Sequence, residues 1–185
     1  VVAEGFEAGG HNGREETTTF CLIPAVRRAT SLPLIAAGGV GTGRGLLAAM
    51  ALGAEGVQVG TRFALTLESS AHPDFKAYGL TLEEGDTKLL LKKLSPTRLV
   101  KGAFCQAVEE AESRGASVEE LRELLGRGRA KKGIFEGDLE DGELELGQVA
   151  SLFRQSQTVA EVMREMVEEY DAALAALKSS SLLDE

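Results

Sequence analysis

Two apolar runs that each end in a glycine turn constrain this chain more than any other feature. The first is PLIAAGGVGTGRG at residues 33–45, and the second is GVQVGTRF at residues 56–63. Each run is typical of a buried strand that is followed directly by a turn with exposed N–H groups. Side by side at one edge of a parallel sheet, the two turns would form the phosphate site that a (β/α)8 barrel builds after its last two strands.

The predicted fold class is therefore α/β, as the C-terminal part of a TIM (β/α)8 barrel. The chain has 185 residues, whereas a whole barrel needs about 250. It opens on Val1-Val2-Ala3, in mid-strand and without an initiator Met. These features favour a trimmed or fragmentary chain that holds about the last three βα units. A complete small α/β domain is the alternative.

The first seventy residues alternate strand and helix with short connections. Such an order implies right-handed crossovers and a parallel sheet. Near-continuous apolar runs are typical of strands covered on both faces. The expected order is a strand at 1–4, a helix at 22–30, a strand at 34–37, a helix at 44–52 and a strand at 57–59.

The remainder is predicted to be mainly helical. A helix is expected to start at 64–71, and a charged helical insert spans 81–132, with Ser117 and Glu120 spaced as a helix capping box. A long amphipathic helix is expected at 158–177, followed by a frayed tail at 178–185. The predicted organisation is barrel strands and helices with the phosphate site at 1–70, a helical insert and closing loop at 71–150, and an amphipathic helix with tail at 151–185.

Composition narrows the functional classes. A net charge of −9 and an estimated pI of 4.9 argue against a nucleic-acid partner. No apolar run approaches a membrane span, and the two cysteines have no metal-ligand spacing. No metal is expected, and the cytoplasm is the default location. The absence of a visible signal peptide means little if the start of the protein is missing.

His11 is the sharpest candidate for chemistry. It follows Gly9 and Gly10 in a glycine-rich loop at the end of the first strand, where the backbone can approach a ligand closely. Imidazole titrates near neutral pH and can move a proton there. A solvated loop histidine is an equally good interpretation. His72, before Pro73, is expected to be structural.

Main-chain groups form the second candidate site. The N–H groups of Gly38, Gly39 and Gly60, with the Thr61 hydroxyl, would donate to phosphate oxygens. Ordinary tight turns are the alternative.

Two polar residues at strand ends flank these turns. Glu4 and Gln58 would reach the polar edge of a heteroaromatic ring. Gln58 interrupts an apolar strand and would need a hydrogen-bond partner if it were buried. A surface carboxylate is the alternative for Glu4.

With these motifs in place, the sequence resembles the nitronate monooxygenase family, formerly called 2-nitropropane dioxygenases, which includes the FMN-dependent enoyl-ACP reductase II. The resemblance is carried by AEGFEAGGH, LPLIAAGG, GVQVGTRF and ESSAHPDFK, and by the closing pattern GD…G…GQ. It covers about residues 1–152 and is strongest in the first seventy. The final helix has no match.

This resemblance implies a TIM barrel with a helical lid after the last strand and non-covalent FMN at the carboxyl ends of the strands. His11 would be the catalytic histidine, with Glu4 and Gly9 near the flavin. The phosphate and ribityl chain would be held by Gly39, Gln58, Val59, Gly60 and Thr61.

The residue at position 4 separates two enzymatic hypotheses. The nitronate monooxygenases tend to carry Gln there, whereas the reductase branch reads AEG, as this chain does. In one hypothesis a nitronate reduces FMN, which then reacts with O2. In the other, NAD(P)H reduces FMN, which then reduces an enoyl thioester. His11 would assist either reaction.

A third hypothesis is a non-catalytic α/β module that binds a phosphate or only its partner chains. Three barrel strands cannot close on themselves, so their open edge would need cover. The expected partners of an enzyme are a small-molecule substrate and further copies of itself as a homo-oligomer.

Overall fold

A parallel three-stranded sheet forms the centre of the chain. The computed structural model describes residues 1–179, so most of the predicted tail at 178–185 lies outside the described residues. The strands are β1 (Val2–Glu4), β3 (Ile35–Ala37) and β4 (Gly56–Gln58), in the order β1-β3-β4. In register, Ala3 pairs with Ala36, and Ala36 pairs with Val57. The predicted parallel strands are confirmed, within one residue at each end.

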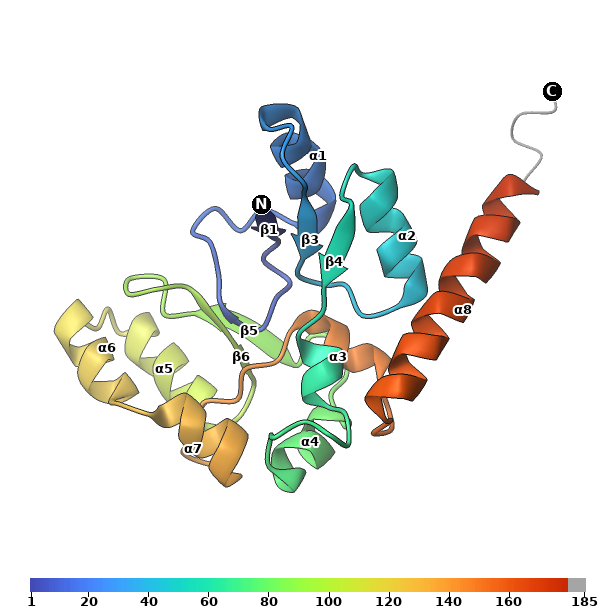
Figure 1. Cartoon of the computed structure of the whole chain (residues 1–185). Helices are drawn as coiled ribbons and strands as arrows, with labels where there is room; N and C mark the ends of the chain where they lie inside the picture. Colours follow the sequence, from blue (N-terminus) through green and yellow to red (C-terminus); the bar gives the residue numbers. More distant parts are fainter. Residues whose placement is uncertain (180–185) are drawn as a thin grey trace.

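Two helices connect these strands and pack on them. They are α1 (Thr19–Ala29) and α2 (Gly43–Ala51), and Figure 1 shows both beside the sheet. The apolar residues of this unit cluster, with Ile23 and Leu34 fully buried between helix and sheet. The helix α2 begins where the Thr42 hydroxyl accepts a hydrogen bond from the Gly45 N–H.

The prediction of a helix that starts at 64–71 is wrong. Instead, α3 (Thr61–Ala64) ends where that helix should begin, and α4 (Pro73–Gly79) follows after a turn region. His72 begins α4, because its Nδ1 accepts a hydrogen bond from the Asp74 N–H at 3.2 Å. The structural role expected for His72 is therefore confirmed.

The insert contains a β-hairpin that the helical prediction missed. Its strands, β5 (Thr87–Leu90) and β6 (Thr97–Val100), are antiparallel. A third short strand, β2 (Gly10–His11), pairs with β6. The loop expected around His11 is therefore part of a second sheet, of order β2-β6-β5.

Three helices complete the insert: α5 (Ala103–Ser113), α6 (Val118–Leu125) and α7 (Arg129–Glu136). The predicted capping box is confirmed at α6, where Ser117 and Glu120 exchange hydrogen bonds. In Figure 1 the three helices lie at the opposite end of the molecule from α1 and α2, and the hairpin lies between them and the parallel sheet.

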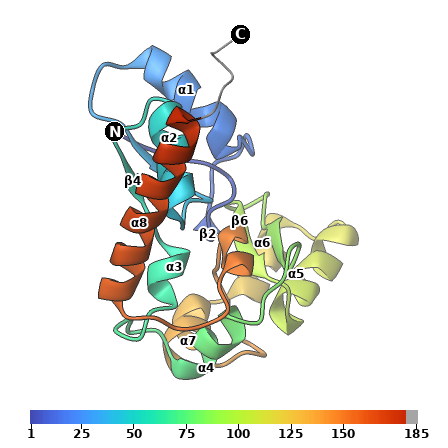
Figure 2. The ribbon, with the colours of Figure 1, turned by 90° about the vertical axis from the view of Figure 1, so that its right-hand side faces the viewer.

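The chain then returns to the parallel sheet through the 3-10 helix η1 (Gln148–Leu152) and the long helix α8 (Val159–Lys178), which confirms the predicted amphipathic helix. Figure 2 shows α8 running along α2. The two helices touch through their main chains, since a Cβ on Gly43 would lie 2.1 Å from the Met166 carbonyl oxygen. Within residues 1–179, no helix has the length and apolar character needed to cross a membrane.

Candidate functional site

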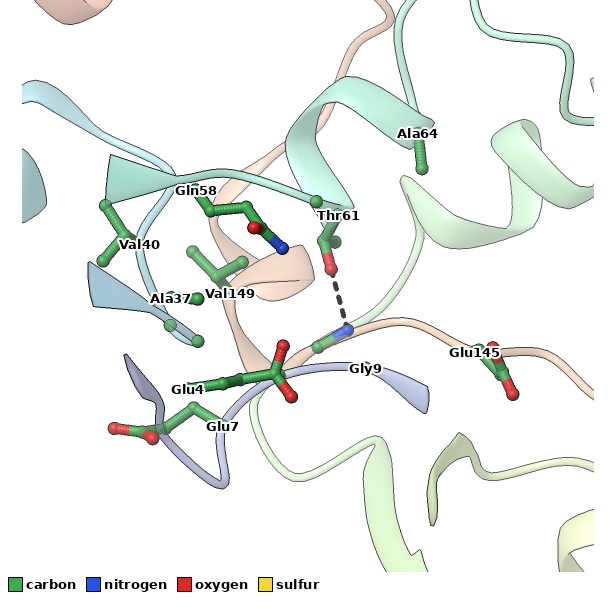
Figure 3. Close-up of a pocket in the computed structure, with 15 residues that line it drawn as sticks. Glu4, Glu7, Gly9, Ala37, Val40, Gln58, Thr61, Ala64, Glu145 and Val149 are labelled. Atoms are coloured by element: carbon green, nitrogen blue, oxygen red, sulfur yellow. Dashed lines mark hydrogen bonds between the residues drawn. The ribbon is translucent and has the colours of Figure 1, made fainter. Parts of the chain in front are cut away.

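A cavity of about 260 Å³ lies where the parallel strands end. It is covered by the segment at 145–149, which we call the closing segment (Figure 3). Most of the predicted cofactor residues line this one cavity, although they come from three separate strand ends. They are Glu4, Gly9, Gly38, Gly39, Gln58, Gly60 and Thr61.

Gly38, Gly39, Gly60 and Thr61 make up what we call the glycine end of the cavity. Gly38 has φ +87°, and a Cβ there would lie 2.4 Å from the Gly5 carbonyl oxygen, so the turn requires glycine. Across residues 1–179, the N–H groups of this end donate to no protein acceptor. The N–H groups therefore remain available to an anion.

The start of α2 contributes fewer free donors than its glycines suggest. The Gly43 N–H donates to the Glu169 carboxylate of α8 at 2.7 Å, and the Gly45 N–H donates to Thr42. Protein groups thus already accept from two of the first N–H groups of the helix. The turn at Gly38 and Gly39, rather than the helix itself, is the part of this connection open to the cavity.

The Thr61 side chain links the two ends of the cavity. Its Oγ1 accepts a hydrogen bond from the Gly147 N–H at 2.9 Å, which Figure 3 shows as a dashed line. A hydroxyl that accepts one hydrogen bond still has its own proton to donate. Thr61 can therefore accept the hydrogen bond from the closing segment and donate its own hydroxyl proton to a ligand oxygen at the same time.

Glu4 and Gln58 extend from the ends of β1 and β4 into the space between these features (Figure 3). Burial raises the pKa of the Glu4 carboxyl above its ordinary value. Their positions suit contact with the polar edge of a ring that reaches past the glycine end.

Glu7 also lines the cavity, but its carboxylate is already used. It accepts hydrogen bonds from the Thr19 N–H at 3.0 Å and from the Thr19 hydroxyl at 3.0 Å, at the start of α1. A carboxylate at a helix N-terminus is stabilised by the free N–H groups there. Glu7 therefore attaches the loop that follows β1 to the start of α1. No local sequence pattern at Glu7 predicted this contact.

Gly9, Glu145 and Gly147 form the other end of the cavity, which we call the closing end. A Cβ on Gly9 would lie 2.6 Å from the Gly147 N, so the two main chains meet with no room for side chains. Gly9 belongs to the glycine-rich loop motif and Gly147 is the last glycine of the closing GD…G…GQ pattern, whereas no motif marks Glu145. Burial raises the pKa of the Glu145 carboxyl, and the nearby charge of His11 opposes that rise.

Three predicted residues do not line the cavity: His11, Gly10 and Val59. The His11 side chain is exposed on β2, beside the closing end. Gly10 precedes it with φ +75°, and a Cβ there would lie 2.9 Å from the Glu145 Oε2. Their roles, like those of the lining residues, stay predictions.

Two buried arginines hold the loops of the site, and neither belongs to a sequence motif. Arg98 of β6 donates to the Phe6 carbonyl at 3.0 and 2.7 Å and lies over the Phe6 ring. Arg62 of α3 donates to the Gly41 carbonyl at 2.7 Å and pairs with Glu165 of α8. Each joins segments far apart in the sequence, so nothing local reveals it.

Comparison with known proteins gives a consistent result. The family model described as nitronate monooxygenase matches residues 1–169. A "Probable nitronate monooxygenase" of Bacillus subtilis is 46% identical over 96 residues, which cover 48% of this chain and 28% of that protein. One of Staphylococcus aureus is 37% identical over 118 residues, which cover 60% of this chain and 33% of that protein.

Two solved structures match nearly the whole chain. FabK from Thermotoga maritima has a TM-score of 0.90 and 38% identity, over 96% of this chain and 56% of that one. A nitroalkane oxidase from Streptomyces ansochromogenes has a TM-score of 0.75 and 28% identity, over 96% of this chain and 53% of that one. The chain thus spans about half the length of these solved relatives.

Proposed function

This chain belongs to the nitronate monooxygenase family, and we propose that the whole protein is an FMN-dependent oxidoreductase that oxidises alkyl nitronates with O2. The observation that carries the proposal is the glycine end. Two neighbouring parallel strands finish in turns whose residues line one cavity, and the N–H groups of these turns have no acceptor among the described residues. Such a group of donors suits a phosphate.

We propose further that β1, β3 and β4 are the last three strands of a TIM barrel. The parallel order β1-β3-β4 and the match to about half of each solved relative support this. The divisions at 1–70, 71–150 and 151–185 would then be barrel, insert with closing loop, and final helix. The outer edges of β1 and β4 would pair with the barrel's other strands.

The residues present fit FMN. Gly38, Gly39, Gly60 and Thr61 would hold its phosphate, and Gln58 with Val59 would lie along the ribityl chain. Glu4 and Gly9 would lie near the ring. Bound there, the flavin would supply the electron transfer, and the protein's share is to bind, orient and exclude water.

His11, beside the closing end, would transfer a proton during the reaction. An exposed imidazole on a short strand beside the cavity can exchange its proton with solvent and with a substrate at the mouth. In the free protein it need not touch the cavity, because catalytic contacts often tighten only once substrate is bound.

A second candidate reaction is NAD(P)H-dependent reduction of an enoyl thioester. Glu4 favours it, because the reductase branch carries Glu in this motif. The stronger match to FabK than to the nitroalkane oxidase favours it too. The same residues would serve in both reactions.

One pair of assays tests these alternatives on the whole enzyme. Purified protein is first scanned for flavin absorbance. It is then mixed with propionate 3-nitronate under air, and separately with NAD(P)H and crotonyl thioester under argon. Oxygen uptake without nicotinamide supports the nitronate reaction, and enoyl-dependent oxidation of nicotinamide supports the reductase. A colourless, oligomeric preparation would instead favour the non-catalytic module.

Replacing His11 tests its place in the reaction. We expect His11→Ala to lower turnover about 100-fold with flavin content near the wild-type level. Loss of flavin would show that His11 binds the cofactor instead.

A further inference from the structure

Arg62 joins the two turns of the glycine end without lining the cavity itself. It directly follows Thr61, and its Nη1 donates to the Gly41 carbonyl at 2.7 Å. Gly41 comes shortly after Gly39 in the turn that follows β3. Thr61 and Val40, the sequence neighbours of Arg62 and Gly41, both line the cavity (Figure 3). One side chain therefore spans the two connections whose N–H groups would have to converge on a single phosphate.

The Arg62 guanidinium is itself held by three further groups. Its Nη2 donates to the Gln157 Oε1 at 3.2 Å and pairs with the Glu165 carboxylate of α8 at 2.7 Å. The Gln157 Nε2 donates to the same carboxylate at 2.7 Å. The guanidinium lies over the Phe153 ring, with its Cζ 4.9 Å from the ring centroid. A planar group held at these points has its orientation fixed as well as its position.

The Gly41 main chain is packed as closely as the guanidinium that it accepts from. A Cβ on Gly41 would lie 2.8 Å from the Phe153 Cζ and 3.0 Å from the Val149 Cγ2. Val149 also lines the cavity. Because a close-packed interior transmits small displacements, a shift of the guanidinium or of the Phe153 ring would move the turn after β3 relative to the turn after β4.

The ion pair between Arg62 and Glu165 is better suited to fixing geometry than to adding stability. The Arg62 side chain is 3% exposed and that of Glu165 is 43% exposed. Burying a guanidinium costs free energy that its partners offset only in part. Within residues 1–179 the Arg62 Nε has no hydrogen-bond partner. The arrangement therefore places the two turns at a defined separation at some cost in desolvation.

We propose that Arg62 is a positioning residue for the cofactor phosphate, and that Glu165 of α8 keeps the guanidinium in the geometry that sets the separation of the two glycine turns. This rests on the proposed function, in which FMN binds at the glycine end. Neither side chain touches the ligand. The effect is specific to the phosphate, because the two turns hold that group, whereas the ring and the ribityl chain lie along other residues.

The test compares two ligands that differ only in the phosphate, FMN and riboflavin. Each is titrated into the whole enzyme freed of flavin, and flavin fluorescence gives the two values of Kd. Their ratio reports what the phosphate contributes to binding. The main variant is Glu165→Ala, because a half-exposed side chain can be truncated without leaving a cavity in the core. We expect its Kd for FMN to rise about 10-fold, with the Kd for riboflavin unchanged.

Three further variants define the effect. Arg62→Lys keeps the charge, but a single ammonium lacks the fork that reaches the Gly41 carbonyl and Glu165 together, so its ratio should fall at least as far. Glu168→Ala removes an exposed carboxylate from the same helix and should keep the wild-type ratio. Arg98→Met removes the other buried guanidinium of the site and should keep the ratio while losing turnover. Circular dichroism checks that each variant is folded.

An unchanged ratio in Glu165→Ala, or an equal rise in both values of Kd, would show that these contacts serve the fold alone and would overturn the proposal. A wild type that binds FMN no better than riboflavin overturns it too, since the turns would then hold no phosphate. A wild type that binds neither ligand sinks the proposed function instead.

Inorganic phosphate would then be the probe for the positioning role. A rise in the midpoint of thermal unfolding with phosphate in the wild type but not in Glu165→Ala would support the link between Glu165 and the two turns. The same response in both proteins would refute it.

Discussion

The two ends of the cavity are built in different ways. The glycine end comes from two turns about twenty residues apart, each directly after a parallel strand. The closing end joins Gly9, near the start of the chain, to Glu145 and Gly147 in its last quarter. The glycine end therefore depends on local backbone geometry, whereas the closing end depends on how distant segments pack.

This difference separates binding from proton handling. The glycine end offers main-chain donors that have no ionisable side chain to titrate. The closing end holds Glu145, with Glu143 two residues before it, and burial raises the pKa of both carboxyls. Changes at the first should affect fold and cofactor retention, and changes at the second should affect turnover and pH dependence.

The largest effect is expected at Gly38. Gly38→Val would place a side chain at φ +87°, with its Cβ 2.4 Å from the Gly5 carbonyl oxygen, so we expect the free energy of unfolding to fall by more than about 4 kcal/mol. Urea unfolding measures this. Gly60→Ala is the control, since a Cβ there meets nothing within 4 Å. Equal losses in both variants would contradict a requirement for glycine at Gly38 that Gly60 does not share.

Arg98 tests the support of the closing end. Arg98→Met removes both hydrogen bonds to the Phe6 carbonyl and leaves that oxygen without its donors, at a cost of about 3 kcal/mol in unfolding free energy. We expect the surviving folded enzyme to keep FMN but lose most of its turnover. Loss of flavin in proportion to activity would show that the two ends are not separable.

Glu143 lies two residues before the closing segment and predicts an effect of pH on stability. Burial raises the pKa of its carboxyl to about 7, above the ordinary value, so the folded state binds the proton more tightly than the unfolded state. Stability should therefore fall as pH rises from about 4.5 to about 7, by roughly 2 kcal/mol. In Glu143→Gln the denaturant midpoint should change less with pH across this range than in the wild type. The same pH dependence in both proteins would contradict the prediction.

Thr61 is where the two ends meet. Thr61→Val leaves the Gly147 N–H without its acceptor, which should cost about 1 to 2 kcal/mol in stability. It also removes a donor to the phosphate, so FMN should bind about 10-fold more weakly. Fluorescence titration with FMN checks this. Thr61→Ser keeps the hydroxyl and should stay near wild type in both measurements.

The smallest effect is expected at Glu169. Its carboxylate accepts from the Gly43 N–H at 2.7 Å, and Glu169→Gln removes the charge but keeps an acceptor. We expect a loss of about 0.5 to 1 kcal/mol in thermal or urea unfolding, with FMN affinity unchanged. Weakened FMN binding would place the start of α2 in the phosphate site.

Local patterns predicted much of the parallel unit. The strands at β3 and β4, the glycine turns after them and the Ser117 capping box all follow from residues adjacent in sequence. The hairpin β5-β6 was missed because its strands are only four residues each, each contains a basic residue, and they pair through contacts that no local period reveals. The helix expected at 64–71 failed because the chain turns at Leu65 to bury it in a core cluster.

The order of residues alone determined where strands end and glycines allow a turn, since main-chain conformation depends on each residue and its immediate neighbours. Only the tertiary structure decided that Glu145 lies beside Gly10, that Glu7 begins α1, and that Arg98 holds the loop at Phe6. Such contacts depend on the packing of segments far apart in the chain. Glu145 lies where Gly10 has no Cβ, and Arg98 lies where the Phe6 carbonyl needs a donor.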